Sequence, residues 1–525
     1  MTLGMNRPRR TAERGGARLR LGRWHRGLVV AVLCTIGFMT SFDTAGHAIA
    51  VPTLLQELGD RPVLHTSIWI PKVYVLAFTA FLMIGGTLAD RFGAKRVLLV
   101  GGLLFVGGTA THIVLATTSI PLVVARVFMG AGVAAMFPAA LSILTAVSDT
   151  ALARARAVTL WSGSCAAGVT VVPLVSGLIL NNVWWPRVIG SVGLVAMLMM
   201  IGVAVLVPAT PADPEFPADW PATIAVTLGV GLIMFALIQT PDWGWSAPPV
   251  VGTLVAGVAM SVVSAIIRRG GTMPHDPFAR ADPRVRPAMF ALGTAWLALF
   301  GIVFLIVQYL QAVRDHSPIF AGSVLFLPTC GASVIGAKLG SAVQRRFGMT
   351  AALVIGLTAV LDGLAIGLAA DARGDLVPIV AMATVACVGF AMVLSVALDA
   401  VSAALPLSPN ASAWAATTTA VPSSGLFGLA IVASTVDRGY RAHLVVPEAS
   451  LPFGGTAISP DSLGKGVAMV ASARQQDRRQ LAEAVQDAFL AGYRHGLLAT
   501  IAIVAAVMAV ILAAAARSRR PGRTR

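Results

Sequence analysis

The stretch GTLADRFGAKR, residues 86–96, ends one long apolar segment and begins the next. Its glycines, Gly86 and Gly93, permit close packing of helices and a turn with positive φ. Asp90 and Arg91, at the end of the first apolar segment, can form an ionic latch that breaks and forms again. The basic residues, Lys95 among them, fit a cytoplasmic loop under the positive-inside rule, but that rule does not explain the acid or the glycines. The stretch therefore predicts a membrane loop with a conformational role.

Composition sets the class of the protein. Of the 525 residues, 57% are hydrophobic and only 12% are charged, and the mean hydropathy is +0.81. No soluble core can absorb so many apolar side chains, so we expect an all-α protein that crosses a membrane many times. The net charge of +16 arises from short basic clusters between apolar segments, which indicates contact with lipid rather than with nucleic acid. All four cysteines fall inside apolar segments, without the spacing of a disulfide framework or a metal site.

Fourteen apolar segments are long enough to cross a bilayer, which takes about 20 residues each. The residues before them, 1–27, carry eight arginines and are expected to form a cytoplasmic tail. The expected spans lie near 28–51, 66–89, 97–115, 120–147, 155–180, 188–207, 220–240, 249–267, 288–312, 320–343, 351–370, 376–404, 412–436 and 492–516.

The distribution of lysine and arginine predicts the orientation. With both termini in the cytoplasm, the tails and the cytoplasmic loops carry 25 of the 39 basic residues. One cytoplasmic segment, 208–219, has acids and no base, and we interpret it as a linker between two halves. The segment 437–491 is then an extracellular loop, in which Leu481, Val485 and Phe489 predict an amphipathic helix on the outer membrane face or at the pore mouth.

An internal repeat supports a division into two bundles. The stretch SAVQRRFG, residues 341–348, repeats the Arg-Phe-Gly of the first loop 255 residues and eight spans later. Two six-span bundles separated by two inserted spans account for this displacement. Arg345 stands at the place of Asp90, so only the first latch is expected to be ionic. The predicted divisions are the tail 1–27, the N-terminal bundle 28–207, the acidic linker 208–219, the inserted helices 220–267, a basic cytoplasmic loop 268–287, the C-terminal bundle 288–516 and the tail 517–525.

These patterns resemble a known family. Residues 86–96 are similar to the loop G-x-L-a-D-r-x-G-r-k between the second and third spans of the major facilitator superfamily, with Ala94 at one basic position. DTAGHAIAVP, residues 43–52, resembles the D-x-T-I-V-N-V-A-L-P stretch of the fourteen-span drug:proton antiporters (EmrB/QacA type), with Ala48 in place of asparagine. RVFMGAG, residues 126–132, is similar to the R-x-x-x-G-x-G stretch of span four. The resemblance implies the major facilitator fold and export of drugs in exchange for protons.

The segment GVTVVPLVSG, residues 168–177, resembles the antiporter motif G-x-x-x-G-P-x-x-G-G. Gly168 and Gly177 match its glycines and let helices approach closely. Pro173 bends the helix where alternating access needs a flexing gate. Val172 and Ser176 stand where the motif has glycine, so an ordinary kinked span is the alternative interpretation.

Asp43 and Arg126 are the candidate proton-coupling pair. Counted at 1.5 Å per residue, both lie about 10 Å below the outer boundary of their spans. An arginine within hydrocarbon costs roughly 2.5 to 3.5 kcal/mol and normally faces an acid or a water-filled cavity, with snorkelling to the surface as the alternative. His47, one helical turn from Asp43, is a candidate proton relay or an interfacial histidine. Asp362, midway along its span, is a second candidate for protonation or for binding a cation.

Aromatic residues are the candidate substrate contacts, because they fall on spans that border the central cavity of the superfamily. Aromatic walls with few polar groups suit a lipophilic compound, planar or cationic, although each ring can instead simply pack helices. The candidates are Trp69, Tyr74, Phe137, Trp161, Trp296, Phe304, Tyr309, Gln311 and Trp414.

Three classes of function remain open. The first is a proton-coupled exporter of lipophilic drugs or a secondary metabolite across a bacterial plasma membrane, and the second is an uptake permease or facilitator on the same fold. The third, an integral-membrane enzyme, is disfavoured because the sequence has no nucleophile–base set, metal-ligand cluster or phosphate-binding glycine loop. The expected partners are a small substrate, protons and membrane lipid. We expect a monomer with no cofactor, metal or nucleic acid.

Overall fold

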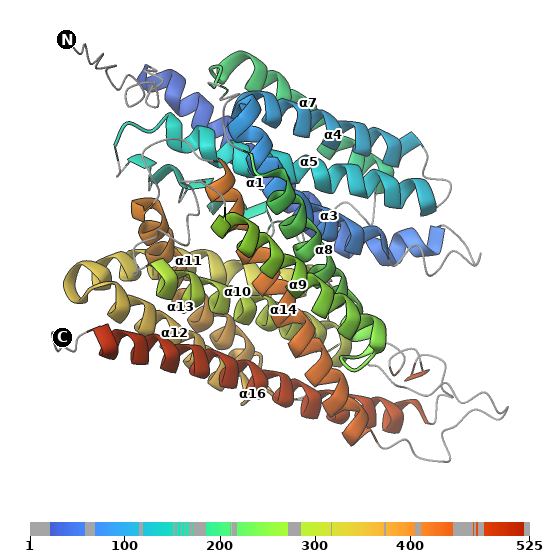
Figure 1. The fold of residues 1–525 in the computed structure, drawn as a ribbon. Coiled ribbons are helices and arrows are strands. Elements are labelled where there is room, and N and C mark those ends of the chain that lie inside the picture. The colour runs from blue at the N-terminus through green and yellow to red at the C-terminus, as the bar shows by residue number, and fades with distance from the viewer. Residues whose placement is uncertain are drawn as a thin grey trace, which may run out of the picture.

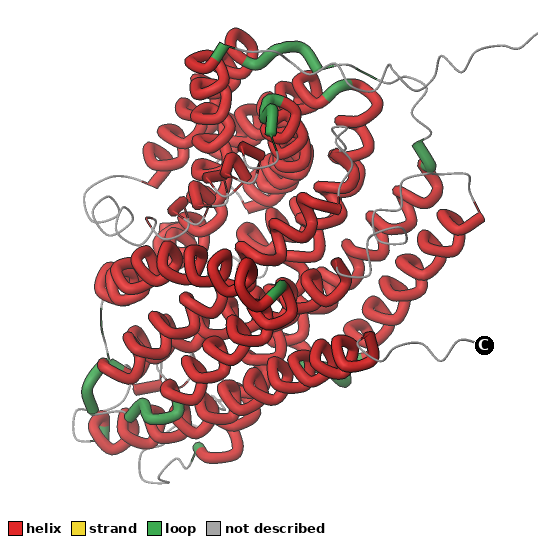
Figure 2. Tube along the Cα trace, turned by 90° about the vertical axis from the view of Figure 1, so that its left-hand side faces the viewer, coloured by secondary structure: helices red, strands yellow, loops and turns green. Residues whose placement is uncertain are grey.

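The structure of the protein is a computed structural model. It describes residues 22–57, 69–114, 119–150, 185–210, 218–270, 285–314, 318–371, 374–404, 411–444 and 477–518, with short pieces between 153 and 171 and isolated residues elsewhere. Figure 2 shows helices joined by short loops throughout this part of the chain.

The N-terminal half is a bundle of long helices. Figure 1 shows them side by side in one half of the molecule. Neighbours in this bundle include α3 with α5, α4 with α5, and α1 with α7. The bounds are α1 (Arg23–Glu57), α3 (Trp69–Phe92), α4 (Ala94–Val114), α5 (Ser119–Ala146) and α7 (Trp185–Leu206).

Two helices, α8 (Trp220–Trp243) and α9 (Pro248–Gly270), follow the first bundle and lie between the two halves in Figure 1. They pack through small residues: a Cβ at Gly257 would lie 2.8 Å from the carbonyl oxygen of Gly229. Asp219 caps α8 by accepting a hydrogen bond from the Ala222 amide at 3.1 Å. Because α8 packs on α3 and α14, the inserted pair contacts both bundles.

The C-terminal half is the second bundle. In Figure 1 it occupies the opposite half of the molecule, and α14 packs on α3 and α5 of the first bundle. The bounds are α10 (Val285–Gln308), the π-helical turn η1 (Tyr309–Val313), α11 (Pro318–Phe347), α12 (Met349–Gly367), α13 (Val377–Ala404), α14 (Ala411–His443) and α16 (Arg478–Ser518).

The all-α membrane prediction is confirmed. Within the described residues, ten helices are long and apolar enough to cross a membrane. Thirteen of the expected spans coincide with a helix named above, and the described pieces of the span at 155–180 are helical. Among the described residues, these contacts and Figure 1 show two groups of helices, with α8 and α9 between them.

The expected loop at 437–491 is shorter at both ends than the sequence suggested. The helix α14 continues to His443, and α16 begins at Arg478 as one continuous helix of 41 residues. The stripe Leu481, Val485 and Phe489 is buried in the C-terminal core. The stripe does lie on a helix, but the expected location on the outer membrane face is wrong, because the apolar face of the helix packs against the bundle.

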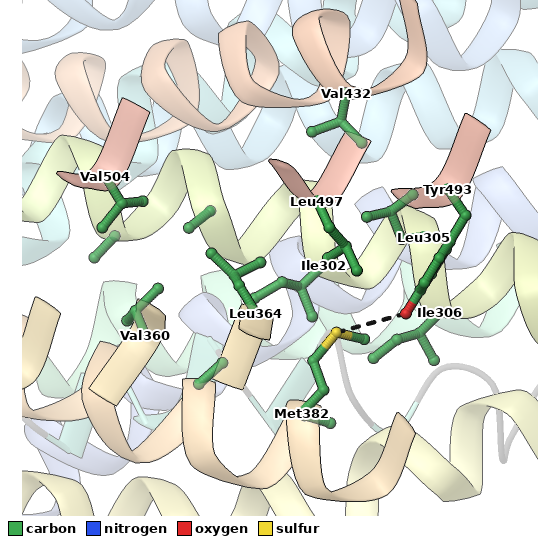
Figure 3. Packing of buried hydrophobic residues seen from close by; sticks show 14 of the residues in the cluster. Ile302, Leu305, Ile306, Val360, Leu364, Met382, Val432, Tyr493, Leu497 and Val504 are labelled. Carbon is green, nitrogen blue, oxygen red and sulfur yellow. Dashed lines mark hydrogen bonds between the residues drawn. The ribbon is translucent and has the colours of Figure 1, made fainter. Parts of the chain in front are cut away.

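Each bundle has its own apolar core. In the first, residues such as Leu33, Leu98 and Met129 are fully buried. Figure 3 shows the second core, in which Leu497 of α16 lies near Ile302 of α10. Separate cores let each half keep its shape when the halves move relative to each other.

Candidate functional site

A buried ion pair joins α1 and α5. The Nη1 atom of Arg126 donates to Oδ2 of Asp43 at 2.9 Å. The side chains are 1% and 0% exposed, respectively. The structure thus brings together the two charges that the depth argument paired, and it does not support snorkelling for Arg126. A pair of this kind is costly to desolvate, so each partner depends on the other.

A tyrosine from a third helix completes this site. The Arg126 guanidinium lies 4.6 Å from the ring centroid of Tyr74 on α3, within the range of a cation–π interaction. Helices α3 and α5 approach closely here, since a Cβ at Gly130 of α5 would lie 2.6 Å from the carbonyl oxygen of Tyr74. Helices α1, α3 and α5 therefore hold the arginine in one position. Tyr74 was predicted as a substrate contact, and its stacking on the arginine was not foreseen.

Aromatic rings extend from this site through the first bundle. The rings of Phe137 and Trp161 are 4.4 Å apart and edge-to-face, and Phe78 packs on Phe137 at 5.5 Å. Trp161 is buried, and its indole nitrogen has no hydrogen-bond partner among the described residues. An indole N–H in such a place can donate to a bound molecule, which removes the cost of leaving it unpaired. Phe78, one helical turn after Tyr74, was missed by the sequence analysis.

The second bundle has a matching aromatic cluster. Trp296 packs edge-to-face on Phe390 at 5.0 Å and lies 5.9 Å from Phe300. Its indole nitrogen is also buried without a hydrogen-bond partner in the described part of the chain. Phe304, two helical turns further along α10, is partly buried against the same core. Each bundle thus contributes one tryptophan with an unused donor.

The loop after α3 docks on the segment that leads to α8. Gly93 has a φ of +91°, and a Cβ there would lie 2.9 Å from the carbonyl oxygen of Thr210. The Lys95 amide donates to Oγ1 of Thr210 at 2.9 Å. The Arg91 guanidinium lies 5.9 Å from the ring centroid of Trp220, the first residue of α8. The loop therefore contacts both the linker and the first inserted helix, and the sequence analysis predicted neither contact.

The other predicted loop residues, Gly86 and Asp90, lie in the last turns of α3 and are buried and half-buried, respectively. The tight packing of α3 on α5 occurs at the neighbouring Gly85, where a Cβ would overlap the carbonyl oxygen of Ala134.

The antiporter-like segment is described at its first residue. Gly168 is buried, and a Cβ there would overlap the carbonyl oxygen of Phe38 on α1, so this span and α1 approach closely. Pro173 and Gly177 lie outside the described residues. The side chains of three other candidates also lie outside them, namely His47, Trp69 and Trp414.

Three predicted residues do not join the site. Tyr309 is fully buried in the second core, and its hydroxyl donates to the carbonyl oxygen of Asp371 at 2.7 Å. Gln311 follows it in the π-helical turn η1. Asp362 lies on an exposed face of α12, which packs on helices of the second bundle. The structure therefore gives Tyr309 a packing role and keeps Asp362 in the opposite half from the ion pair.

The fold and the site define a two-bundle membrane protein with an ion pair buried in one bundle. The family model of the Major Facilitator Superfamily matches residues 33–429. The chain belongs to the major facilitator superfamily. Its fold is similar to that of the POT family transporter PepTSo, with a TM-score of 0.58 and 13% identity over 94% of this chain and 99% of that one. It is also similar to the proton:xylose symporter XylE, with a TM-score of 0.54 and 14% identity over 78% and 88% of the two chains.

Several curated relatives are named for efflux or resistance. The multidrug efflux pump LfrA of Mycolicibacterium smegmatis is 28% identical over 93% of this chain and 95% of its own. The puromycin resistance protein of Streptomyces alboniger is 30% identical over 66% of this chain and 67% of its own. The tetracenomycin C resistance and export protein of Streptomyces glaucescens is 30% identical over 67% and 64% of the two chains.

Proposed function

We propose that the protein exports lipophilic compounds across a bacterial plasma membrane in exchange for protons. The observation that carries the proposal is the buried pair of Asp43 and Arg126, at 2.9 Å, in a membrane-spanning bundle. Intramembrane ionisable residues mark ion and proton pathways in transporters. The names of the relatives, which include a multidrug efflux pump and an export protein, support outward transport of drugs or of a secondary metabolite.

Asp43 is the proposed proton carrier. Burial favours the neutral carboxyl group, and the Arg126 guanidinium favours the carboxylate, so the two influences oppose each other and a proton can load and leave. When Asp43 is protonated, the ion pair weakens, and the stacking on Tyr74 keeps the arginine in place. A cationic substrate competes with the proton for the same carboxylate, and such exclusion is what antiport requires. His47 is kept as a proposed relay one turn away on α1.

The two aromatic clusters are the proposed substrate contacts. Trp161 with Phe137 in one bundle, and Trp296 with Phe390 in the other, offer apolar faces together with two unused indole donors. Such surfaces suit planar lipophilic compounds, whether neutral or cationic. We propose that transport involves no enzymatic step, cofactor or metal. We also propose that the protein is a monomer with both termini in the cytoplasm.

The loop 86–96 is the proposed conformational latch. Its contacts with Thr210 and Trp220 attach it to the segment between the bundles. Because α8 packs on both bundles, a movement of the loop can be transmitted to both halves. The span with Gly168 and Pro173 is proposed to flex where it approaches α1.

The proposal is tested in a pump-deficient bacterial host and in inverted membrane vesicles. Expression of the protein is expected to lower susceptibility to several unrelated lipophilic cations, and acidifying the vesicle interior should drive substrate into the vesicles. A matched strain carrying the Asp43→Asn variant at equal expression is the control. Proton-driven movement of substrate in the opposite direction would instead establish an uptake permease on the same fold.

A further inference from the structure

Two histidines face each other where α14 and α16 pack together in the second bundle. His443 lies in the last turn of α14 and His495 in α16, and both are exposed. Their ring centroids are 5.7 Å apart, and the ring planes are inclined by 39°. In Figure 1 the C-terminal end of α14 lies beside α16 at the lower right. The proposed transport function uses neither residue.

Hydrogen bonds fix the same tautomer on both rings. Nδ1 of His443 lies 2.9 Å from the carbonyl oxygen of Gly439, and Nδ1 of His495 lies 2.8 Å from that of Ala491. A carbonyl oxygen can only accept, so each Nδ1 carries the hydrogen and each Nε2 keeps a lone pair. Histidines that bind metals generally donate their other N–H to a backbone carbonyl or a carboxylate in this manner.

The helix geometry directs the two rings toward each other. Side chains on a helix tilt toward its N-terminus, so on antiparallel neighbours such as α14 and α16 these two rings lean into the same space. Gly439 leaves room for this, since a Cβ there would lie 2.8 Å from Nδ1 of His495. A metal ion about 2.0–2.1 Å from each Nε2 lies roughly 3.2 Å from each ring centroid. Centroids 5.7 Å apart are within the reach of one shared ion.

We propose that His443 and His495 bind a divalent transition-metal ion of the Zn²⁺, Ni²⁺ or Cu²⁺ class, with water completing the coordination. Imidazole nitrogens suit these ions and do not suit Mg²⁺ or Ca²⁺. The nearest charged neighbour in sequence on α14, Arg441, is paired with Asp437 at 2.5 Å, which offsets its repulsion of a cation. Two protein ligands make a weak, reversible site, and an ion bound there joins α14 to α16.

Calorimetric titration of the full chain with ZnCl₂ and NiCl₂ tests this site, with the protein purified by a tag that contains no histidine. Wild type is expected to bind one ion per chain. His443→Gln and His495→Gln should each weaken binding at least tenfold, and the double variant should lose little more, because losing one ligand already breaks the chelate. His316→Gln, which changes a histidine that packs on Phe320 outside this pair, is the matched control and should bind as wild type does.

A second readout keeps the result independent of folding. Circular dichroism and Tm without metal establish that each variant is folded, and Zn²⁺ should raise the Tm of wild type and of His316→Gln only. Unchanged Zn²⁺ affinity in folded His443→Gln or His495→Gln would overturn the proposal. So would an equal loss of affinity in His316→Gln, which would place the bound ion elsewhere.

Discussion

The two copies of the Arg-Phe-Gly turn have the same backbone geometry and different surroundings. Gly93 and Gly348 have φ values of +91° and +86°. The Gly93 amide donates to the carbonyl oxygen of Ala89, and the Gly348 amide donates to that of Gln344. Both hydrogen bonds span four residues and are 3.0 Å long. The short sequence therefore determines the turn itself, because only glycine adopts this conformation at little cost.

The surroundings separate the two copies. A Cβ at Gly93 would press on Thr210, whereas a Cβ at Gly348 would meet no described atom within 4 Å. Asp90 in the first copy is Arg345 in the second. The buried ion pair also belongs to the first half, while the core of the second is apolar and holds the hydrogen-bonded hydroxyls of Tyr309 and Tyr493. The comparison indicates that the turn repeats, whereas the buried ion pair and the docked loop, to which we assign proton coupling and switching, belong to the first half alone among the described residues.

The largest effect is expected from Arg126→Ala. It removes the guanidinium that pairs with the buried Asp43 carboxylate, and breaking a buried ion pair costs about 3–5 kcal/mol. We expect a clear fall in Tm and loss of proton-driven transport. Lys338→Ala, which removes an exposed charge from α11 in the other half, is the control and should leave the Tm within the error of wild type. Equal Tm shifts for the two variants would contradict the claim that the buried ion pair sets the first half apart from the second.

Alanine at the two turn glycines separates backbone strain from docking. Each substitution costs about 1–3 kcal/mol through the positive φ. Gly93→Ala should cost more than Gly348→Ala, since Thr210 must also move away from the new methyl group. Thermal unfolding of the purified variants measures this. A larger effect of Gly348→Ala would contradict the docking of the first turn.

Asp90→Asn is expected to slow transport about tenfold, or ~1.4 kcal/mol in the barrier, while substrate affinity stays near that of wild type. The reason is that, in the proposed mechanism, the loop 86–96 controls the change between conformations and does not contact substrate. Rates in proteoliposomes and substrate binding to the purified protein are measured together. Arg345→Gln, at the equivalent place in the second copy, should change neither quantity. A large loss of substrate binding in Asp90→Asn, with a normal transport rate, would contradict the proposal that this loop is a conformational latch.

The smallest effect is expected from Thr210→Val. The hydroxyl accepts one hydrogen bond from the Lys95 amide, and a single bond of this kind contributes about 0.5–1.5 kcal/mol. We expect a small fall in Tm and a modest change in transport rate. Thr210→Ser retains the acceptor and should restore both. Failure of serine to restore the rate would show that the hydrogen bond does not link the loop to the linker.

Local and periodic features were predictable from the sequence. Span positions follow from hydropathy, and the pairing of Asp43 with Arg126 follows from counting residues to the membrane boundary, because the rise of a helix is fixed. The positive φ of Gly93 was also predictable, because a turn conformation depends on only a few neighbouring residues. These features need no knowledge of how distant segments pack.

Contacts between distant segments were not predictable. The hydrogen bond from Lys95 to Thr210 joins positions 115 residues apart, and no sequence pattern in the acidic linker predicts it. Tyr309, in η1, was predicted as a substrate contact, yet its hydroxyl donates to the Asp371 carbonyl oxygen and its ring is buried in the second core. An aromatic residue on a span looks the same in sequence whether it faces a substrate or packs helices, because hydropathy does not report which neighbours surround it.

The central claim is that Asp43 carries the coupling proton, and transport driven by a pH gradient in proteoliposomes tests it most directly. Asn at position 43 resembles the protonated acid and cannot release a proton. We expect the Asp43→Asn protein to lose uphill transport, to less than about one-tenth of the wild-type rate, a barrier change of more than ~1.4 kcal/mol, while retaining downhill exchange of substrate. If this variant still concentrates substrate against its gradient, the coupling proton is carried elsewhere and the account of the ion pair is wrong.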